Sequence, residues 1–137
     1  MKSERGFTLI EIMVVVVILG ILTALAPPKV IDRIIDARIQ AAKTDISTLE
    51  GAVSFYRMDN YTNPPMELGL RALVEAPPDH IAPNWRAGEY IKKLPNDPWG
   101  NAYRYSNDGS AIDIYTLGAD QRPGGDANDT DVHWKDL

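Results

Sequence analysis

The stretch that decides the fold is Gly6-Phe7-Thr8-Leu9-Ile10-Glu11, followed by the apolar run from Ile12 to Ala26. From Phe7 to Ala26 the only charged residue is Glu11. At about 1.5 Å of rise per residue, a helix of this length spans roughly 30 Å, the thickness of the hydrocarbon core of a bilayer. The run therefore predicts a membrane-spanning helix over residues 7–26, preceded by a short basic leader over residues 1–6.

Two simple interpretations of this run are a secretory signal and a plain membrane anchor. A secretory signal has an apolar core of about 7–15 residues, whereas this run is longer and continues into a helical pattern. A plain anchor fits both the length and the flanking charge, with Glu11 reaching toward the interface. An unpaired carboxylate inside the membrane costs at least about 2.5 kcal/mol, so Glu11 is a candidate functional residue.

The segment from Gly6 to Glu11 resembles the class III signal of type IV pilins and of the pseudopilins of type II secretion. The resemblance implies that a prepilin peptidase cleaves between Gly6 and Phe7 and methylates the new amino terminus of Phe7. It also places the assembly residues of the family on Glu11 and Pro28. In a filament, we expect Glu11 to pair with the N-terminal amine of a neighbouring subunit, which removes a lone charge and disfavours misregistered subunits.

The helical pattern resumes at Pro27-Pro28 and predicts an amphipathic extension over residues 27–57, with a kink near Pro28. Apolar residues recur along it at spacings of four and three, which is typical of one buried helix face. They are Ile35, Ile39, Ala42, Ile46, Leu49, Val53 and Tyr56. This stripe needs a partner, and residues 58–137 are the part of the chain left to form one.

The remainder of the chain contains signals for short elements. A helix is expected over Met66 to Glu75, an irregular loop over residues 77–89, and a hairpin of strands Ala102–Tyr105 and Ile112–Leu117 around an Asp-Gly turn. A third strand is expected near Asp131 to Trp134. Several aromatic side chains are expected in or over the core: Trp85, Trp99, Tyr103, Tyr105 and Tyr115. The sequence thus predicts an α+β fold, in which a long N-terminal helix packs on a small C-terminal antiparallel β-sheet.

Composition excludes several classes of function. The net charge is −5, and Lys92-Lys93 is the only basic pair that stands out, which argues against nucleic-acid binding. The chain has no cysteine, so it has neither a disulfide nor a thiolate zinc site. Neither His80 nor His133 lies beside a nucleophile motif, so we do not expect an enzyme. The basic leader predicts a cytoplasmic N-terminus, with the acidic remainder in a periplasm-like compartment.

The C-terminal loop over residues 117–131 is rich in oxygen-bearing side chains and contains Gly124-Gly125. The side chains are those of Asp120, Asp126, Asn128, Asp129 and Asp131. Calcium takes six to eight such oxygens in flexible geometry, although the spacing here is not that of an EF-hand. The alternative is that Asp, Asn and Gly simply form turns in this loop.

Four further segments resemble the major pseudopilin of type II secretion. They are Asp45–Glu50, Ile91–Pro95, Asp97–Asn101 and Tyr115–Asp120. Type IV pilins share the N-terminal third but usually carry a C-terminal disulfide loop, which a chain without cysteine cannot form. The resemblance implies a structural Ca²⁺ ion. Its expected ligands are the carbonyl of Leu117, Asp120, and some of Asp126, Asn128, Asp129 and Asp131.

The same resemblance implies a function in assembly. The chain would be a structural subunit of the type II secretion pseudopilus, polymerising in the periplasm to drive folded proteins across the outer membrane. The implied partners are further copies of itself, minor pseudopilins, the inner-membrane assembly platform, the prepilin peptidase and, before assembly, membrane lipid. We expect a single-pass protein of the bacterial inner membrane. The alternatives are a type IV pilin, a minor pseudopilin and a membrane-anchored binding module.

Overall fold

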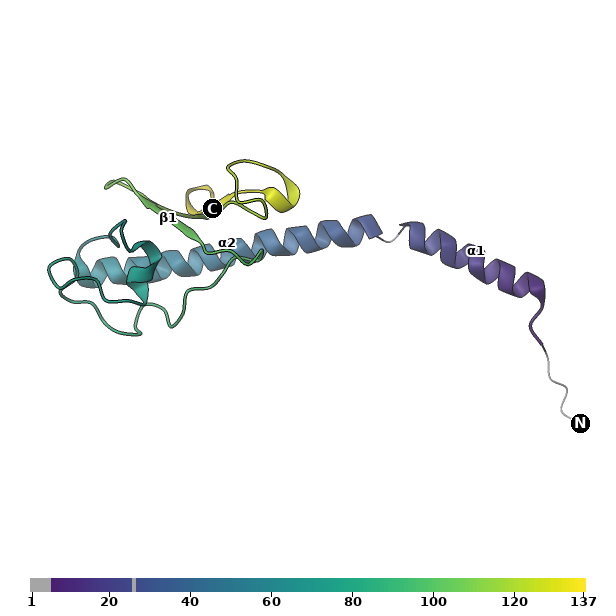
Figure 1. The fold of residues 1–137 in the computed structure, drawn as a ribbon, viewed down its shortest axis with the longest axis horizontal. Coiled ribbons are helices and arrows are strands. Elements are labelled where there is room, and N and C mark those ends of the chain that lie inside the picture. The colour runs from purple at the N-terminus through teal and green to yellow at the C-terminus, as the bar shows by residue number, and fades with distance from the viewer. Residues whose placement is uncertain (1–5, 26) are drawn as a thin grey trace, which may run out of the picture. The chain divides into compact units, whose positions relative to one another are not determined.

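The computed structural model describes residues 6–25 and 27–137 (Figure 1). The chain divides into two compact units, Met1–Ile34 and Ile35–Leu137. Helix α1 (Leu9–Leu25) belongs to the first unit, and helix α2 (Pro27–Asn60) begins there and supplies the long helix of the second. The second unit, which contains the sheet, is called the globular unit below.

Helix α2 begins at two consecutive prolines. A proline is tolerated in the first turn of a helix because the N–H that it lacks has no partner there. Ala26 lies outside the described residues, and so does the kink predicted at this point. At the other end α2 continues to Asn60 rather than ending at residue 57. The side-chain amide of Asn60 donates to the carbonyl oxygen of Tyr56 (3.1 Å) and to the hydroxyl of Tyr90 (3.2 Å), which ties this end to the globular unit.

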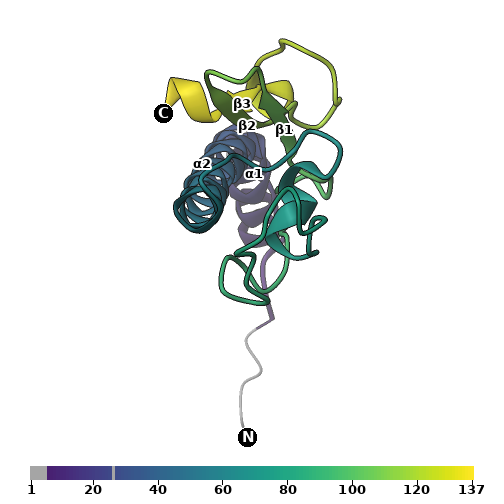
Figure 2. The ribbon, with the colours of Figure 1, turned by 90° about the vertical axis from the view of Figure 1, so that its left-hand side faces the viewer.

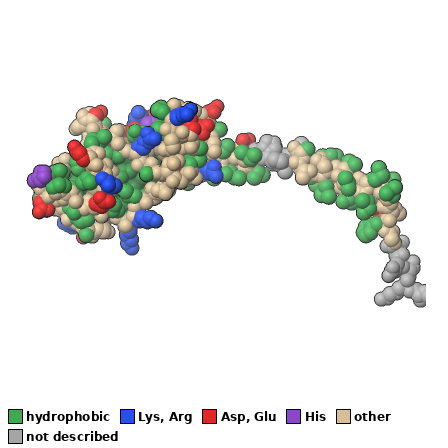
Figure 3. Space-filling view, in the orientation of Figure 1, with side chains coloured by type: hydrophobic (Ala, Val, Ile, Leu, Met, Phe, Trp, Pro, Cys, Tyr) green, Lys and Arg blue, Asp and Glu red, His purple; other side chains and the backbone are tan. Residues whose placement is uncertain are grey.

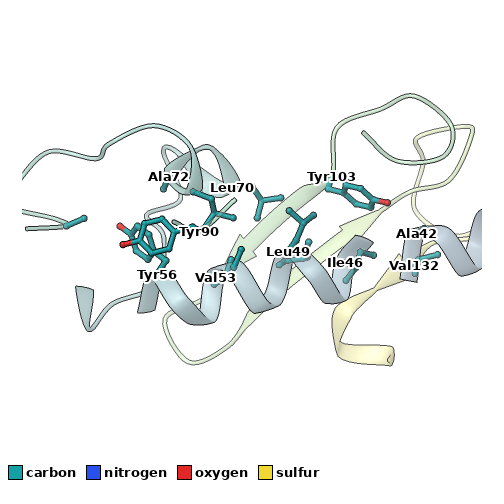
Figure 4. Packing of buried hydrophobic residues seen from close by; sticks show 14 residues of the cluster. Ala42, Ile46, Leu49, Val53, Tyr56, Leu70, Ala72, Tyr90, Tyr103 and Val132 are labelled. Carbon is teal, nitrogen blue, oxygen red and sulfur yellow. The ribbon is translucent and has the colours of Figure 1, made fainter. Parts of the chain in front are cut away.

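The predicted apolar stripe of α2 forms the centre of the core (Figure 4). Its five C-terminal members are completely buried: Ala42, Ile46, Leu49, Val53 and Tyr56. Ile39 packs against the edge of this cluster. The stripe is confirmed from Ile39 to Tyr56, whereas Ile35 is half-buried and lies outside the core cluster. Burying this face removes apolar side chains from water, which stabilises the fold by roughly 25 cal/mol per Å² of apolar surface.

The partner of the stripe includes a three-stranded antiparallel sheet in the order β1-β2-β3 (Figure 2). Its strands are β1 (Arg104–Asn107), β2 (Ile112–Thr116) and β3 (Val132–His133). Tyr105 pairs with Ile114 in β1 and β2, and Thr116 pairs with Val132 in β2 and β3. Ile114 and Val132 are buried in the same cluster as the α2 stripe, so the predicted α+β fold is confirmed.

Three predicted elements differ in extent from those observed. The first strand begins at Arg104 rather than at Ala102, because Ala102 forms an isolated bridge with Asn96. The helix predicted from Met66 to Glu75 is only a 3-10 helix, η1 (Gly69–Leu73). Gly69 has a φ of +54°, and a left-handed residue at this point prevents a continuous α-helix. The third strand is limited to β3, which is followed by a final 3-10 helix, η3 (Trp134–Asp136).

Four of the five aromatic predictions are confirmed. Trp85, Trp99, Tyr103 and Tyr105 lie in or against the core cluster, and the indole N–H of Trp85 donates to the carbonyl of Ala72 (2.7 Å). The prediction that Tyr115 lies in the core is wrong, because its ring stacks on that of His133 with centroids 4.8 Å apart. Its neighbours in the strand, Ile114 and Thr116, are the buried residues. Alternation along a strand sends Tyr115 to the opposite face.

Tyr103 links the sheet side of the core to α2 through a hydrogen bond of its hydroxyl. Its hydroxyl donates to Oδ2 of Asp45 (2.9 Å). Burial, followed by this hydrogen bond, raises the pKa of Tyr103 well above its usual value of 10. Because the folded state holds this proton more tightly than the unfolded state, the contribution of Tyr103 to stability is complete below pH 10 and declines above it.

We therefore expect the melting temperature of the full chain in detergent micelles to fall between pH 10 and pH 11.5. Tyr103→Phe should make this dependence shallower, since it removes one hydroxyl with a raised pKa and leaves those of Tyr56, Tyr90 and Tyr105. It should also lower stability at pH 7 by about 1 kcal/mol through the lost hydrogen bond. Tyr61→Phe is the matched control, because the Tyr61 side chain is 88% exposed. An alkaline loss in Tyr103→Phe as steep as in the parent chain would contradict the assignment.

Candidate functional site

The first candidate site is the N-terminal segment with helix α1. The large apolar side chains from Phe7 to Leu22 keep between 50% and 83% of their surface exposed. Figure 3 shows hydrophobic side chains covering the part of the chain that forms α1. By length and composition, the helical stretch that begins at Leu9 is able to cross a membrane. Within one subunit this surface has no partner among the described residues, so a membrane or other subunits must cover it.

Glu11 closes a capping box at the start of α1. Its Oε2 accepts hydrogen bonds from the backbone N–H of Thr8 (2.9 Å) and from the Thr8 hydroxyl (3.0 Å). The backbone N–H of Glu11 donates in return to the same hydroxyl (3.3 Å). This reciprocal pattern satisfies donors that a helix start leaves free. In the single chain, Glu11 is therefore a capping carboxylate held next to the predicted cleavage point.

Two of the other predicted residues, Gly6 and Phe7, directly precede that cap in the sequence. Gly6 and Phe7 are exposed and precede α1 without helical structure. The remainder of the leader, residues 1–5, lies outside the described residues. Pro28 lies in the first turn of α2, away from Glu11 in the sequence.

The second candidate site is the acidic loop over residues 117–131. The residues before Gly124-Gly125 are called its N-terminal limb and those after them its C-terminal limb, and the two limbs meet at Asp129. A Cβ atom at Gly118 would lie 2.6 Å from the carbonyl carbon of Asp129. A Cβ atom at Gly125 would lie 2.6 Å from the carbonyl oxygen of the same residue. Gly118 and Gly125 also have φ values of +63° and +109°. Glycine at these two positions therefore allows the limbs to approach backbone to backbone.

Two predicted ligands lie on the N-terminal limb of this loop. Leu117 is buried directly after β2, and Asp120 is exposed. Oδ1 of Asp120 accepts a hydrogen bond from the backbone N–H of Arg122 (3.0 Å), which forms a local turn.

Three further acidic residues lie on the C-terminal limb: Asp126, Asp129 and Asp131. Asp126 is exposed and precedes the 3-10 helix η2 (Ala127–Asp129) without capping it through its side chain. Oδ2 of Asp131 accepts from the backbone N–H of Gly124 (2.7 Å). In the described part of the chain, the other oxygen of Asp131 is buried and has no hydrogen-bond partner. A buried, unpartnered carboxylate oxygen is costly unless a cation or water reaches it.

Asn128 differs from the other predicted ligands. Its Oδ1 accepts hydrogen bonds from the indole N–H of Trp99 (2.8 Å) and from a guanidinium N–H of Arg38 (3.2 Å). The structure thus directs this oxygen toward α2 and the Trp99 turn and away from the acidic side chains of the loop.

The donor chemistry of the loop fits a hard cation such as Ca²⁺, which prefers carboxylate and carbonyl oxygens. The unpartnered oxygen of Asp131 is the structural observation in favour of this fit. Among the described residues, no three side chains of His, Cys, Asp or Glu come together as a metal centre. Backbone carbonyls would therefore have to supply several of the ligands.

The structure also reveals a buried carboxylate beside this loop. Asp97 is 4% exposed, and its Oδ1 accepts from the backbone N–H groups of Trp99 (3.0 Å) and Asn101 (2.8 Å). Its Oδ2 accepts from the hydroxyl of Thr116 (2.5 Å). The Asp-Pro-Trp-Gly pattern is typical of this turn. No local pattern connects Asp97 with Thr116, which ends strand β2.

A histidine–carboxylate pair lies on the outer face of the sheet. Nδ1 of His133 lies 2.7 Å from Oδ2 of Asp113, and its other nitrogen lies 4.0 Å from Oδ2 of Asp131. Strand pairing places Tyr115 opposite His133, which brings Asp113 into reach. The pair could not be anticipated, because it depends on the register of two strands.

Comparison with known proteins identifies the family of this chain. A model of the prokaryotic N-terminal methylation motif matches residues 1–27, and a model of type II secretion system protein G matches residues 29–135. The chain belongs to the type II secretion system protein G family. The chain is a pseudopilin, a structural subunit of the pseudopilus, and its family is not a known family of enzymes.

Individual relatives support this family over nearly the whole chain. The type II secretion system core protein G of Pseudomonas aeruginosa is 48% identical over 96% of this chain and 94% of its own length. That of Klebsiella pneumoniae is 43% identical over 98% and 96%. The crystal structure of the major pseudopilin from enterohaemorrhagic Escherichia coli matches with a TM-score of 0.68 and 35% identity. It covers 82% of this chain and 99% of the other.

Proposed function

We propose that this pseudopilin is the major subunit of a periplasmic pseudopilus that helps to drive folded proteins across the outer membrane. It is made as a single-pass inner-membrane precursor with a cytoplasmic N-terminus and is cleaved between Gly6 and Phe7 by the prepilin peptidase. Its further partners are the assembly platform of the inner membrane and minor pseudopilins. The match to protein G along residues 29–135 favours this function over a type IV pilin or a minor pseudopilin.

The observation that carries the proposal is the exposed apolar surface of α1 around the capping carboxylate of Glu11. Extraction from the bilayer exposes this surface to water unless other copies of the helix cover it. Packing of α1 helices supplies this cover. Subunits added along a screw axis then form an open filament.

The first test concerns Glu11. In a filament, the Glu11 carboxylate gives up its hydrogen bond from the N–H of Thr8 and binds the methylated amine of a neighbouring subunit. The two groups form an ion pair in a region of low dielectric. We expect Glu11→Ala to reduce filament yield and secretion at least tenfold in a strain lacking this protein. The measurements are sheared-filament yield and the secreted fraction of a substrate protein.

Thr8→Val is the matched control, because it removes the hydroxyl of the capping box but keeps the carboxylate. Mass spectrometry should show normal cleavage and methylation in both variants, so that a defect is assigned to assembly. Normal filaments and secretion in Glu11→Ala would contradict the pairing.

We also propose that the acidic loop holds a structural Ca²⁺ ion. The carbonyl of Leu117, further backbone carbonyls of the loop, and some of the carboxylates of Asp120, Asp126, Asp129 and Asp131 are the groups that would hold it. The ion would neutralise the repulsion between these carboxylates and satisfy the buried oxygen of Asp131. A loop without a disulfide gains from such a clamp, since metal binding contributes directly to folding.

Calcium should raise the melting temperature of the full chain in detergent micelles by about 10 °C or more at saturating concentration. The expectation follows from a stabilisation of about 2.7 kcal/mol at a hundred times the dissociation constant, and from about 4 °C per kcal/mol. Magnesium at the same concentration is the control, and Asp131→Asn should abolish most of the calcium shift. Equal melting temperatures with calcium and with a chelator would mean that the aspartates only form turns.

A further inference from the structure

Asn128 joins the acidic loop to two other parts of the globular unit. Its side-chain oxygen accepts from Arg38 on α2 (3.2 Å) and from the indole of Trp99 (2.8 Å). Its backbone carbonyl accepts from the N–H of Ala119 on the opposite limb of the loop (3.0 Å). A single residue of η2 thus contacts the helix, the Asp97–Gly100 turn and the other limb.

The surroundings of Asn128 are built to hold that side chain. Asn128, Trp99 and Arg38 are all partly buried, so water competes less for these hydrogen bonds than at an open surface. The turn that presents Trp99 is fixed by the buried carboxylate of Asp97, which accepts from the Trp99 backbone N–H. The two donors therefore come from rigid elements, and they fix the position of a loop that has little regular structure of its own.

We propose that Asn128 is a positioning residue of the acidic loop and not a ligand of the cation. It holds η2 against α2 and the Trp99 turn, and so keeps Asp129 and Asp131 in place for the ion. The expected effect on calcium binding rests on the proposed function. The positioning role of Asn128 in the metal-free chain does not depend on it.

Asn128 is either a ligand of the cation or a positioning residue. The two roles predict opposite effects on calcium affinity when Arg38, which cannot itself bind a cation, is replaced. Replacing Arg38 removes a positive charge near the acidic loop, so electrostatics alone predicts tighter calcium binding. If Arg38 acts by holding Asn128, its loss weakens calcium binding instead. Groups that orient metal ligands typically change affinity by about 10- to 100-fold.

The experiment uses the full chain in detergent micelles and measures its dissociation constant for Ca²⁺ by calorimetry. We expect Asn128→Ala, Arg38→Met and Trp99→Phe each to weaken binding at least tenfold. The double variant Asn128→Ala with Arg38→Met should be little weaker than either single variant, because both remove the same contact. Lys43→Met is the charge control, since Lys43 is an exposed cation on the same helix α2.

A second measurement follows hydrogen exchange of the Ala119 amide without metal. Exchange should be at least tenfold faster in Asn128→Ala and in Arg38→Met, and Asn128→Asp, which keeps an oxygen acceptor, should restore the slow exchange. Tighter or unchanged calcium binding in Arg38→Met beside weaker binding in Asn128→Ala would overturn the proposal and make Asn128 a ligand. If the parent chain binds no calcium, the proposed metal site fails. Unchanged hydrogen exchange of the Ala119 amide in Asn128→Ala and in Arg38→Met would overturn the positioning role as well.

Discussion

Gly118→Ala is expected to lower the free energy of unfolding of the globular unit by about 3–5 kcal/mol. A left-handed conformation costs a residue with a Cβ roughly 1–2 kcal/mol. Here the new Cβ would also lie 2.6 Å from the carbonyl carbon of Asp129 and 2.9 Å from its Cα. The contact is with backbone, so it is relieved only by moving the two limbs of the acidic loop apart. Urea unfolding of the full chain in detergent micelles, followed by tryptophan fluorescence, measures the loss.

Gly88→Ala separates the two causes of this loss. Gly88 also has a positive φ, +73°, but a Cβ there would meet nothing within 4 Å. We expect about 1 kcal/mol of destabilisation from the conformation alone. Equal losses in Gly88→Ala and Gly118→Ala would show that the close approach to Asp129 contributes nothing.

Asp97→Ala is the second substitution with a large expected effect, about 3 kcal/mol or more. The variant leaves three donors without an acceptor inside the globular unit: the N–H groups of Trp99 and Asn101 and the hydroxyl of Thr116. Each buried group without a partner costs about 1–3 kcal/mol. Because the turn also positions Trp99, the loss should extend to the acidic loop.

Asp97→Asn tests whether geometry or charge is the cause. The amide oxygen still accepts from the two backbone N–H groups, and the Thr116 hydroxyl can rotate to accept from the new NH₂ group. We expect a loss of about 1 kcal/mol in the same urea assay. A loss as large as that of Asp97→Ala would show that the negative charge itself stabilises the turn.

Much of the fold was predictable because it depends on local periodicity. The stripe from Ala42 to Tyr56 repeats at helical spacing, and the structure buries all five of its members that lie in this range. The hairpin turn was equally plain. Asp108 accepts from the N–H groups of Ser110 and Ala111 at 2.9 and 2.8 Å, and Gly109 has a φ of +89°.

The candidate sites were predictable only in part. The composition of the acidic loop indicated oxygen ligands, but it did not distinguish Asn128 from its acidic neighbours. That distinction depends on Arg38, which is 90 residues away in the sequence. The length of η1 was overestimated for a similar reason, since a left-handed Gly69 breaks the helical pattern.

The sequence by itself determined the apolar helix, the signal around Gly6 and Glu11, the amphipathic stripe and the family. Each of these is written in neighbouring residues, where hydrophobic periodicity and motif chemistry act directly. Only the tertiary structure decided that Tyr115 turns away from the core and that Asn128 binds α2 and Trp99. These features depend on strand register and on donors brought together from distant parts of the chain, and no local pattern contains that information.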